Sequence, residues 1–312
     1  MSSSSLVERL KLRGRRLAGA IVHAAGGYRW LLPVFEPSPT GVRRRLQTYL
    51  NLYYSGKETV EVALKVPELD VTFRCDLRDH MLEPWVKGWA PVYELAEIEH
   101  VRAQAGPGDR IVDLGANHGF WGFSVARAAG QGARLVLVEA NPTVVRRLRR
   151  TCVLNPGIDA TVVECALGDG AVSEIPFFLP RTGLSGLGSI VLHDHAREHG
   201  FLEAGRRMVV KARTLDSLVA EGVIDGMDLV KIDLEQAEDL FLEGARKAFC
   251  RFRPRLVMCE TSSESKTFEF FRDLGYRPYM LDPRGELGAL PEERFWGNIF
   301  FGRDGETEAL PS

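Results

Sequence analysis

After Pro107, short apolar runs alternate with stretches of helical periodicity, and this alternation is the feature that most restricts how the chain can fold. Strands that alternate with helices stack on a largely parallel sheet. The apolar runs predict strands near Arg110–Leu114, Arg134–Glu139, Thr161–Cys165, Asp228–Asp233, Arg255–Glu260, Arg277–Leu281 and Asn298–Phe301. We therefore expect an α/β fold with helices on both faces of the sheet, whose ligands bind at the carboxyl ends of the strands.

Two segments between the predicted strands have their own pattern. Apolar residues at helical spacing from Ala237 to Phe249 predict one continuous helix with a buried stripe. The other face of that helix, which carries Glu238 and Glu243, is expected to stay in contact with water. The segment Ala171–Ala212 holds a glycine-rich stretch, and we expect a mobile lid there.

The region 1–92 is predicted to be an accessory layer ahead of a main domain at 93–304 and a tail at 305–312. Its first 50 residues carry nine basic side chains and two acids, and apolar residues lie on one helical face at Leu6, Leu10, Leu17 and Ile21. A helix docked on the body or a dimer contact is the preferred interpretation, and an interfacial membrane helix is the alternative. The alternating run Thr59–Cys75 predicts a β-hairpin.

Composition excludes several classes of protein. The formal net charge is -2, from 40 Lys+Arg against 42 Asp+Glu, so no nucleic-acid partner is expected. Five cysteines without a CxxC pair indicate neither a disulfide framework nor a cysteine zinc site, and a cytoplasmic protein is expected. No apolar stretch approaches the roughly 18 residues of a membrane helix, so no stable membrane insertion is expected.

A glycine turn at Gly115–Gly119 follows the first predicted strand of the main domain. Such a turn lets the backbone approach a ligand closely. The next strand ends in Glu139, 20 residues after Gly119, where a carboxylate can accept hydrogen bonds from ribose hydroxyls. Asn141 and Pro142 suit the cap and the first turn of the following helix. These linked features predict a nucleoside cofactor.

The turn also discriminates among nucleoside cofactors. It lacks the G-x-G-x-x-G of dinucleotide sites, and the sequence holds no GxxxxGK[ST], so NAD and ATP fit poorly. Asp113 precedes the turn, where an acid can hydrogen-bond a ligand ammonium group. S-adenosylmethionine has an amino-acid end, a ribose and an adenine but no phosphate, and it is the cofactor that we expect.

Several blocks of the sequence resemble the FkbM-type S-adenosylmethionine-dependent methyltransferases: Asp113–Gly119, Glu139–Pro142, Ala166–Asp169, Asp228–Glu238, Glu260 and Asn298–Phe301. The resemblance covers roughly Tyr93 to Phe301. It implies a Rossmann-like class I methyltransferase with a seven-stranded, mostly parallel sheet and an antiparallel last strand. It also implies O-methylation of a sugar or another small hydroxylated metabolite, of the kind made in secondary metabolism.

The resemblance also implies which residues bind the cofactor: Asp113, Gly115, Ala116, Asn117, Gly119, Glu139, Ala140, Asn141, Cys165 and Ala166. Two positions depart from the family pattern. Gln236 stands where the family usually has glycine, and Glu164 stands where it often has asparagine.

Acids at the ends of the fourth and fifth predicted strands are the candidate catalytic residues: Asp233, Glu235 and Glu260. Asp233 is expected to act as a general base or as a metal ligand. If a metal is present, Asp233 and Glu260 are its expected ligands, and Mg²⁺ suits their oxygens. The alternatives are a helix cap for Asp233 and first-turn dipole stabilisation for Glu235.

Other functions stay open. One is methylation of a nitrogen, a nucleic acid or a peptide, although Asp233-Leu234-Glu235-Gln236 replaces the Asn/Asp-Pro-Pro-aromatic tetrad common in base methylation. Another is a non-catalytic scaffold. His193, His195 and His199 resemble a ligand cluster, but a solvated segment is the preferred interpretation because no fourth ligand is in register. A homodimer through the basic N-terminal arm is a further expectation.

Overall fold

A computed structural model describes residues 3–24, 49, 52–54, 57, 59–82, 91–180, 184–192, 202–282, 284–288 and 290–303. The chain divides into two compact units. The smaller unit comprises residues 1–64, 75–93 and 182–184, and the larger one comprises residues 65–74, 94–181 and 185–312. The predicted tail 305–312 and the three histidines, His193, His195 and His199, lie outside the described residues.

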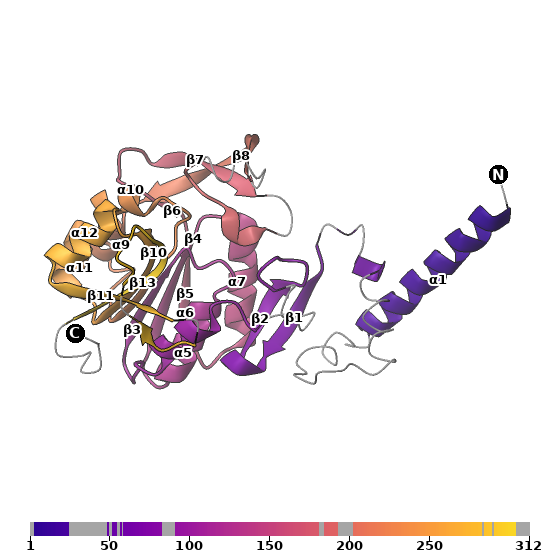
Figure 1. Cartoon of the computed structure of the whole chain (residues 1–312), viewed down its shortest axis with the longest axis horizontal. Coiled ribbons are helices and arrows are strands. Elements are labelled where there is room, and N and C mark those ends of the chain that lie inside the picture. Colours follow the sequence, from indigo (N-terminus) through magenta and orange to yellow (C-terminus); the bar gives the residue numbers. More distant parts are fainter. Residues whose placement is uncertain are drawn as a thin grey trace. The chain divides into compact units, whose positions relative to one another are not determined.

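The smaller unit contains the long basic helix α1 (Ser3–Ala24) (Figure 1). One face of this helix packs on Tyr49, Tyr53 and Tyr54. A Cβ atom at Gly19 would lie 2.0 Å from the backbone oxygen of Tyr49, so only glycine permits this approach. One turn further on, Nδ1 of His23 lies 3.2 Å from the hydroxyl oxygen of Tyr54. No helix in the described part of the chain is both long enough and apolar enough to cross a membrane.

The predicted hairpin is present as β1 (Glu61–Val66) and β2 (Val71–Asp76), which pair as a two-stranded sheet. The 3-10 turn Pro67–Leu69 joins them, and Asp70 ends that turn with φ 51°. Residues 65–74 of this hairpin belong to the larger unit, where the ring of Phe73 meets the ring of Phe120 edge-on at 4.8 Å between centroids.

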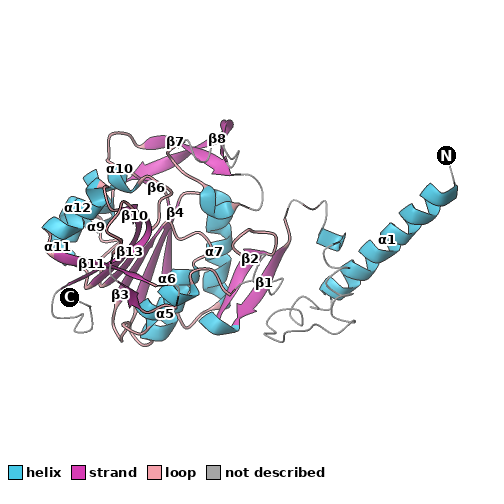
Figure 2. Cartoon of the chain, in the orientation of Figure 1, coloured by secondary structure: helices cyan, strands magenta, loops and turns pink. Residues whose placement is uncertain are grey.

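The core of the larger unit is one sheet (Figure 2). Its strands run in the order β12 (Leu287–Gly288), β11 (Tyr276–Leu281), β13 (Trp296–Arg303), β10 (Leu256–Ser262), β9 (Leu229–Ile232), β3 (Arg110–Leu114), β4 (Arg134–Glu139) and β5 (Asp159–Glu164). The five strands from β10 to β5 are parallel, and β13 lies antiparallel between β10 and β11. The α/β Rossmann-like prediction is confirmed, together with its antiparallel last strand.

The predicted number of seven strands is one too few, because the described residues form eight strands in this sheet. The extra strand is β12, which pairs with the end of β11. A turn returns the chain there: Oδ1 of Asp282 accepts hydrogen bonds from the backbone N–H groups of Arg284 and Glu286, at 2.8 and 2.9 Å. A strand of two residues is too short to show an alternation of apolar and polar residues, so β12 could not be predicted from the sequence.

Helices cover both faces of the sheet, as predicted (Figure 2). They are α5 (Leu95–Arg102), α6 (Phe120–Ala129), α7 (Pro142–Leu154), α9 (Leu215–Ala220), α10 (Glu238–Glu243), α11 (Arg246–Phe252) and α12 (Lys266–Asp273). Asp113 of β3 points towards α6, where a Cβ atom at Gly122 would lie 2.7 Å from its Oδ2. Val112 and Leu114 point to the opposite face and share an apolar core with Phe241.

The predicted continuous helix from Ala237 to Phe249 is wrong, because the structure has two short helices, α10 and α11, with Gly244 and Ala245 between them. Leu240, expected in the buried stripe, is 37% exposed. A residue from a distant segment binds the chain at the break and in α11. Asp216 donates its backbone N–H to the Gly244 oxygen at 2.9 Å, and its Oδ1 accepts the N–H of Ala248 at 2.7 Å. Asp216 thereby caps α11 as a separate helix.

The insertion Ala171–Ala212 contains regular structure. β7 (Glu174–Pro180) and β8 (Leu202–Arg213) form an antiparallel pair, and β6 (Ala166–Leu167) adds to the other side of β8 (Figure 1). The glycine-rich stretch contributes the short 3-10 turn η2 (Ser185–Leu187). A bridge between Phe178 and Ser189 ties the chain after η2 back to β7.

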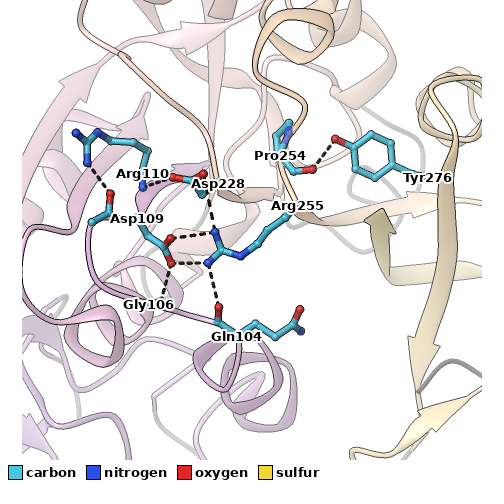
Figure 3. A network of polar contacts seen from close by, with 9 residues as sticks. Gln104, Gly106, Asp109, Arg110, Asp228, Pro254, Arg255 and Tyr276 are labelled. Atoms are coloured by element: carbon cyan, nitrogen blue, oxygen red, sulfur yellow. Dashed lines mark hydrogen bonds and ion pairs between the residues drawn. The ribbon is translucent and has the colours of Figure 1, made fainter. Parts of the chain in front are cut away.

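The amino ends of three central strands are joined by a polar network (Figure 3). The guanidinium of Arg255 donates to Oδ1 of Asp109 and to the backbone oxygen of Gln104, both at 2.9 Å. The backbone N–H of Arg110 donates to Oδ2 of Asp228 at 2.7 Å. These bonds fix how β3, β9 and β10 are aligned along the strand direction at their amino ends. The candidate functional site lies at the opposite edge of the sheet, where the strands have their carboxyl ends.

Candidate functional site

The glycine turn after β3 approaches the end of β9 closely. Gly115 has φ +81°, and a Cβ atom there would lie 1.8 Å from the backbone oxygen of Asp233. Both the backbone conformation and the space require glycine. The N–H of Gly115 donates to the oxygen of Val138 at 3.0 Å, which ties the turn to the end of β4 as well. The turn therefore lies where the ends of three strands meet.

Glu139, the last residue of β4, lies beneath this turn and is buried. Its Oε2 accepts the N–H of Asn117 at 2.9 Å, and its Oε1 accepts the N–H of Asn141 at 2.7 Å. Burial raises the pKa of Glu139, and these backbone hydrogen bonds oppose the increase. Each carboxylate oxygen can accept a further hydrogen bond from a ligand.

The predicted start of α7 is confirmed. Oδ1 of Asn141 accepts the N–H of Thr143 at 3.0 Å, and Pro142 occupies the first turn. Cys165 and Ala166, just after β5, are buried, and the N–H of Cys165 donates to the backbone oxygen of Glu139 at 3.1 Å. Burial raises the pKa of the Cys165 thiol to about 12. That these two residues and Ala140 contact a cofactor stays a prediction.

Asp113 is 1% exposed, and its two carboxyl oxygens differ. Oδ2 accepts the N–H of Gly122 at 3.0 Å, whereas Oδ1 is buried without a hydrogen-bond partner among the described residues. Burial raises the pKa of Asp113 to about 7, although the Lys231 ammonium opposes this. A buried oxygen without a hydrogen-bond partner can accept a hydrogen bond from a donor group of a ligand.

Lys231 of β9 is a buried cation that is not among the site residues predicted from the sequence. Its Nζ lies 2.8 Å from Oε2 of Glu94 and 3.1 Å from Oδ2 of Asp233. Nδ2 of Asn298 donates to the other Glu94 oxygen at 3.0 Å. Burial disfavours the charge of Lys231, but the neighbouring carboxylates outweigh it and hold the pKa of Lys231 well above its usual value. The sequence feature that could have indicated Lys231 is a charged residue within an otherwise apolar parallel strand.

The three predicted catalytic acids come together at the carboxyl edge of the sheet. One carboxylate oxygen from each of Asp233, Glu235 and Glu260 lies within 4.8 Å of the others. Burial, followed by the neighbouring Asp233 carboxylate, raises the pKa of Glu260 to about 9 and that of Glu235 well above its usual value. At neutral pH the cluster therefore holds protons as well as negative charge.

Both alternatives based on a helix terminus are wrong. Helix α10 begins at Glu238 and its N-cap is Ala237, so Asp233 does not cap it. Glu235 and Gln236 precede the helix with φ 53° and 69°, so Glu235 is not in its first turn. A positive φ favours glycine, which explains why the family usually has glycine at the position of Gln236.

The expectation that Glu238 stays in contact with water is also wrong, because this side chain is 5% exposed. Its Oε1 accepts the N–H of Leu234 at 2.8 Å, which closes the loop that carries Asp233 and Glu235. Burial raises the pKa of Glu238 to about 7, with its backbone hydrogen bonds opposing. Glu243, on the outer face of α10, is exposed as predicted.

Two serines of the insertion reach the site, and neither is among the site residues predicted from the sequence. Oγ of Ser185 donates to Oδ1 of Asn117 at 2.9 Å, and Oγ of Ser189 donates to the backbone oxygen of Glu235 at 2.7 Å. The glycine-rich stretch was the only signal. His118, in the glycine turn, is buried and stacks on Phe120. The insertion thus borders both the glycine turn and the acid cluster.

Comparison with known proteins gives a consistent result. A family model described as the methyltransferase FkbM domain matches residues 113–281. No curated protein matches the sequence.

Several solved structures are similar to the chain at low identity. A methyltransferase FkbM from Methylobacillus flagellatus KT is 14% identical, with a TM-score of 0.40 over 91% of this chain, and this chain covers 60% of that one. TYW2 from M. jannaschii, in complex with AdoMet, is 15% identical with a TM-score of 0.42, covering 80% and 88%. A putative O-methyltransferase from Klebsiella pneumoniae is 14% identical with a TM-score of 0.41, covering 76% and 90%.

Proposed function

Because the chain belongs to the FkbM methyltransferase family, we propose that it is an S-adenosylmethionine-dependent O-methyltransferase. Its acceptor is a hydroxyl group of a small molecule, either a sugar or another secondary metabolite. The sequence holds five cysteines without a CxxC pair, which supports a reducing compartment such as the cytoplasm.

One observation carries this proposal: the backbone oxygen of Asp233 lies directly against Gly115 of the glycine turn. A methyl donor held by the turn and a proton acceptor at Asp233 would then be neighbours. Methyl transfer is an in-line displacement, and holding the reacting atoms at attack distance can contribute about 7–11 kcal/mol. The close approach of the two strand ends supplies this positioning.

The described residues fit S-adenosylmethionine on two counts. Gly115 keeps the turn without a side chain where its backbone packs on the Asp233 oxygen, and Asp113 holds a buried oxygen without a partner among the described residues. Asp113 would receive the ammonium group, and Glu139 would accept hydrogen bonds from the ribose hydroxyls. When bound, the cofactor supplies a methyl group on a sulfonium, and the electron pair of the broken C–S bond stays on sulfur.

The chain's own part in the reaction is to orient the acceptor and to take its proton. Asp233 accepts the proton of the acceptor hydroxyl as the new O–C bond forms. Lys231 holds Oδ2 of Asp233 in place at 3.1 Å. A protonated Glu260 removes one negative charge from the cluster beside the Lys231 ammonium group.

The same cluster supports a second form of the mechanism. Asp233, Glu235 and Glu260 offer three hard oxygen ligands within 4.8 Å of one another, which is a donor set that Mg²⁺ accepts. The metal would polarise the acceptor hydroxyl. In this form Asp233 would be a ligand and another group would take the proton.

The test compares Asp233→Asn with Asp225→Asn, a matched change at an exposed residue in an ion pair with Arg110. Binding of S-adenosylmethionine is measured by calorimetry, and transfer of a labelled methyl group to a mixture of hydroxylated metabolites is measured by mass spectrometry. We expect Asp233→Asn to bind the cofactor and to lose about 10²–10⁴-fold in turnover, whereas Asp225→Asn behaves as the unaltered protein.

Two results would contradict the proposal. No binding of S-adenosylmethionine at millimolar concentration would remove the activity altogether, and labelled product on nitrogen atoms would replace O-methylation by N-methylation. Turnover by Asp233→Asn equal to that of Asp225→Asn would reject Asp233 as the proton acceptor.

A further inference from the structure

The basic helix α1 presents an apolar edge away from the segment on which it packs. Leu17 and Ile21 are 64% and 63% exposed. Gly19, between them in sequence, is buried against the backbone of Tyr49. At about 100° per residue, the direction midway between Leu17 and Ile21 lies roughly 180° from that of Gly19. The apolar edge therefore has no packing partner in the described part of the smaller unit.

Cations flank this edge on both sides. On the same helical projection, Arg13 lies roughly 60° to one side of the edge and Lys11 roughly 100° to the other. Both side chains are exposed, as are those of Arg9, Arg15 and Arg16. The helix has five basic residues and a single acid, Glu8. Arginine and lysine beside an apolar strip can extend their charged ends to the level of phosphate groups while their stems stay in apolar surroundings.

We propose that α1 is an interfacial helix that docks the protein on an anionic membrane surface. Its edge of Leu17 and Ile21 enters the boundary between headgroups and acyl chains, and the flanking cations bind lipid phosphates. A cationic polar face, an apolar face and low overall hydrophobicity are the features of helices that lie in a membrane interface. The helix lies on the bilayer and does not cross it.

Charge favours this occupant over a second copy of the chain. Pairing two α1 helices along their apolar edges would bring ten basic residues together against two acids, whereas an anionic bilayer compensates them. A nucleic acid would also neutralise the cations, but it offers an exposed leucine and isoleucine nothing comparable to acyl chains.

The test is co-sedimentation of the full chain with vesicles of phosphatidylcholine alone and of phosphatidylcholine mixed with phosphatidylglycerol. We expect binding to the mixed vesicles that weakens as salt is raised. The partition coefficient of the double variant Leu17→Gln/Ile21→Gln should be lower by at least about tenfold, because less apolar surface is buried in the membrane. Arg13→Gln should lose about fivefold on mixed vesicles. Val153→Gln, at a 79% exposed position of α7, is the matched control and should change nothing.

Circular dichroism establishes that the variants keep their helix content. Equal binding by the double variant and the control would overturn the proposal, as would no binding to mixed vesicles. A dimer in sedimentation velocity that the double variant abolishes would assign the edge to a second copy instead. If the unaltered protein and the double variant are retained equally on RNA and neither binds vesicles, the cations of α1 bind nucleic acid instead. The test measures no methyl transfer, so its outcome is independent of the proposed enzyme activity.

Discussion

The ammonium group of Lys231 lies 3.1 Å from Oδ2 of Asp233, two residues further along the same strand end. Residues two apart on a strand point to the same face, so β9 delivers a cation and an acid together. Glu94 binds the same ammonium group at 2.8 Å from a position 137 residues away in the sequence. The lysine that holds Asp233 is therefore itself bound by an acid from a distant segment.

Removing the Lys231 charge is expected to affect stability and turnover separately. Lys231→Met leaves buried carboxylates without a counter-charge and should cost about 3–5 kcal/mol of unfolding free energy. Lys231→Met/Glu94→Gln removes both charges of the pair and should recover part of that loss. Turnover should stay low in both variants, because Asp233 is no longer held. Urea denaturation and single-turnover rates test this, and full turnover in the double variant would make Lys231 purely structural.

The glycine turn predicts a difference between two glycines of similar conformation. Gly115 and Gly108 have φ +81° and +84°, but a Cβ atom at Gly108 meets nothing within 4 Å. Alanine at either position carries the same backbone strain, and only Gly115→Ala also strikes the Asp233 backbone. We expect Gly115→Ala to be less stable than Gly108→Ala by about 1–3 kcal/mol and to bind S-adenosylmethionine more weakly. Equal affinity in the two variants would mean that the turn does not hold the cofactor.

Glu238 predicts a loss of stability as pH rises. Its pKa is about 7 in the folded protein against the ordinary 4.5, so the folded state retains the proton that the unfolded state releases. Unfolding free energy should therefore fall between pH 4.5 and 7, by about 3 kcal/mol from this group. Glu238→Gln keeps an acceptor for the Leu234 N–H and should be more stable than the unaltered protein at pH 8 but not at pH 4.

Urea denaturation at both pH values measures this difference. The exposed Glu243→Gln is the control, and its stability should follow that of the unaltered protein throughout. If Glu238→Gln gains nothing at pH 8, the buried carboxyl does not titrate in this range.

Chelation discriminates between the two forms of the mechanism. Lys231 already compensates Asp233, and Glu260 holds a proton at neutral pH, so we expect turnover to persist in excess EDTA. Turnover that EDTA abolishes and Mg²⁺ restores would assign Asp233, Glu235 and Glu260 to a metal site.

The sequence predicted the central strands well because each is a short apolar run in a parallel sheet. The structure has β3 and β4 at the predicted bounds, Arg110–Leu114 and Arg134–Glu139. The acids of the site were also found, because strand ends in such a sheet meet at one edge. Contacts between distant segments could not be found in this way. Glu94 reaches Lys231 from the N-terminus of α5, and no local pattern indicates such a pairing.

The break between α10 and α11 shows the same limit. Helical periodicity continues through Gly244 and Ala245, so the sequence favours one helix, whereas the side chain of Asp216 caps the start of α11 from another segment. The two missed serines, Ser185 and Ser189, lie in a stretch whose composition indicates a loop but not the groups that the loop will contact.

The contact between Gly115 and the Asp233 backbone has a consequence for how this protein can diverge. A larger residue at 115 is tolerated only if the strand carrying 233 withdraws, and that withdrawal would carry the acid away from its lysine. Positions 115 and 233 are thus restricted jointly, and new acceptor preferences are more accessible through the 171–212 insertion, which borders the same space without fixing the two strand ends.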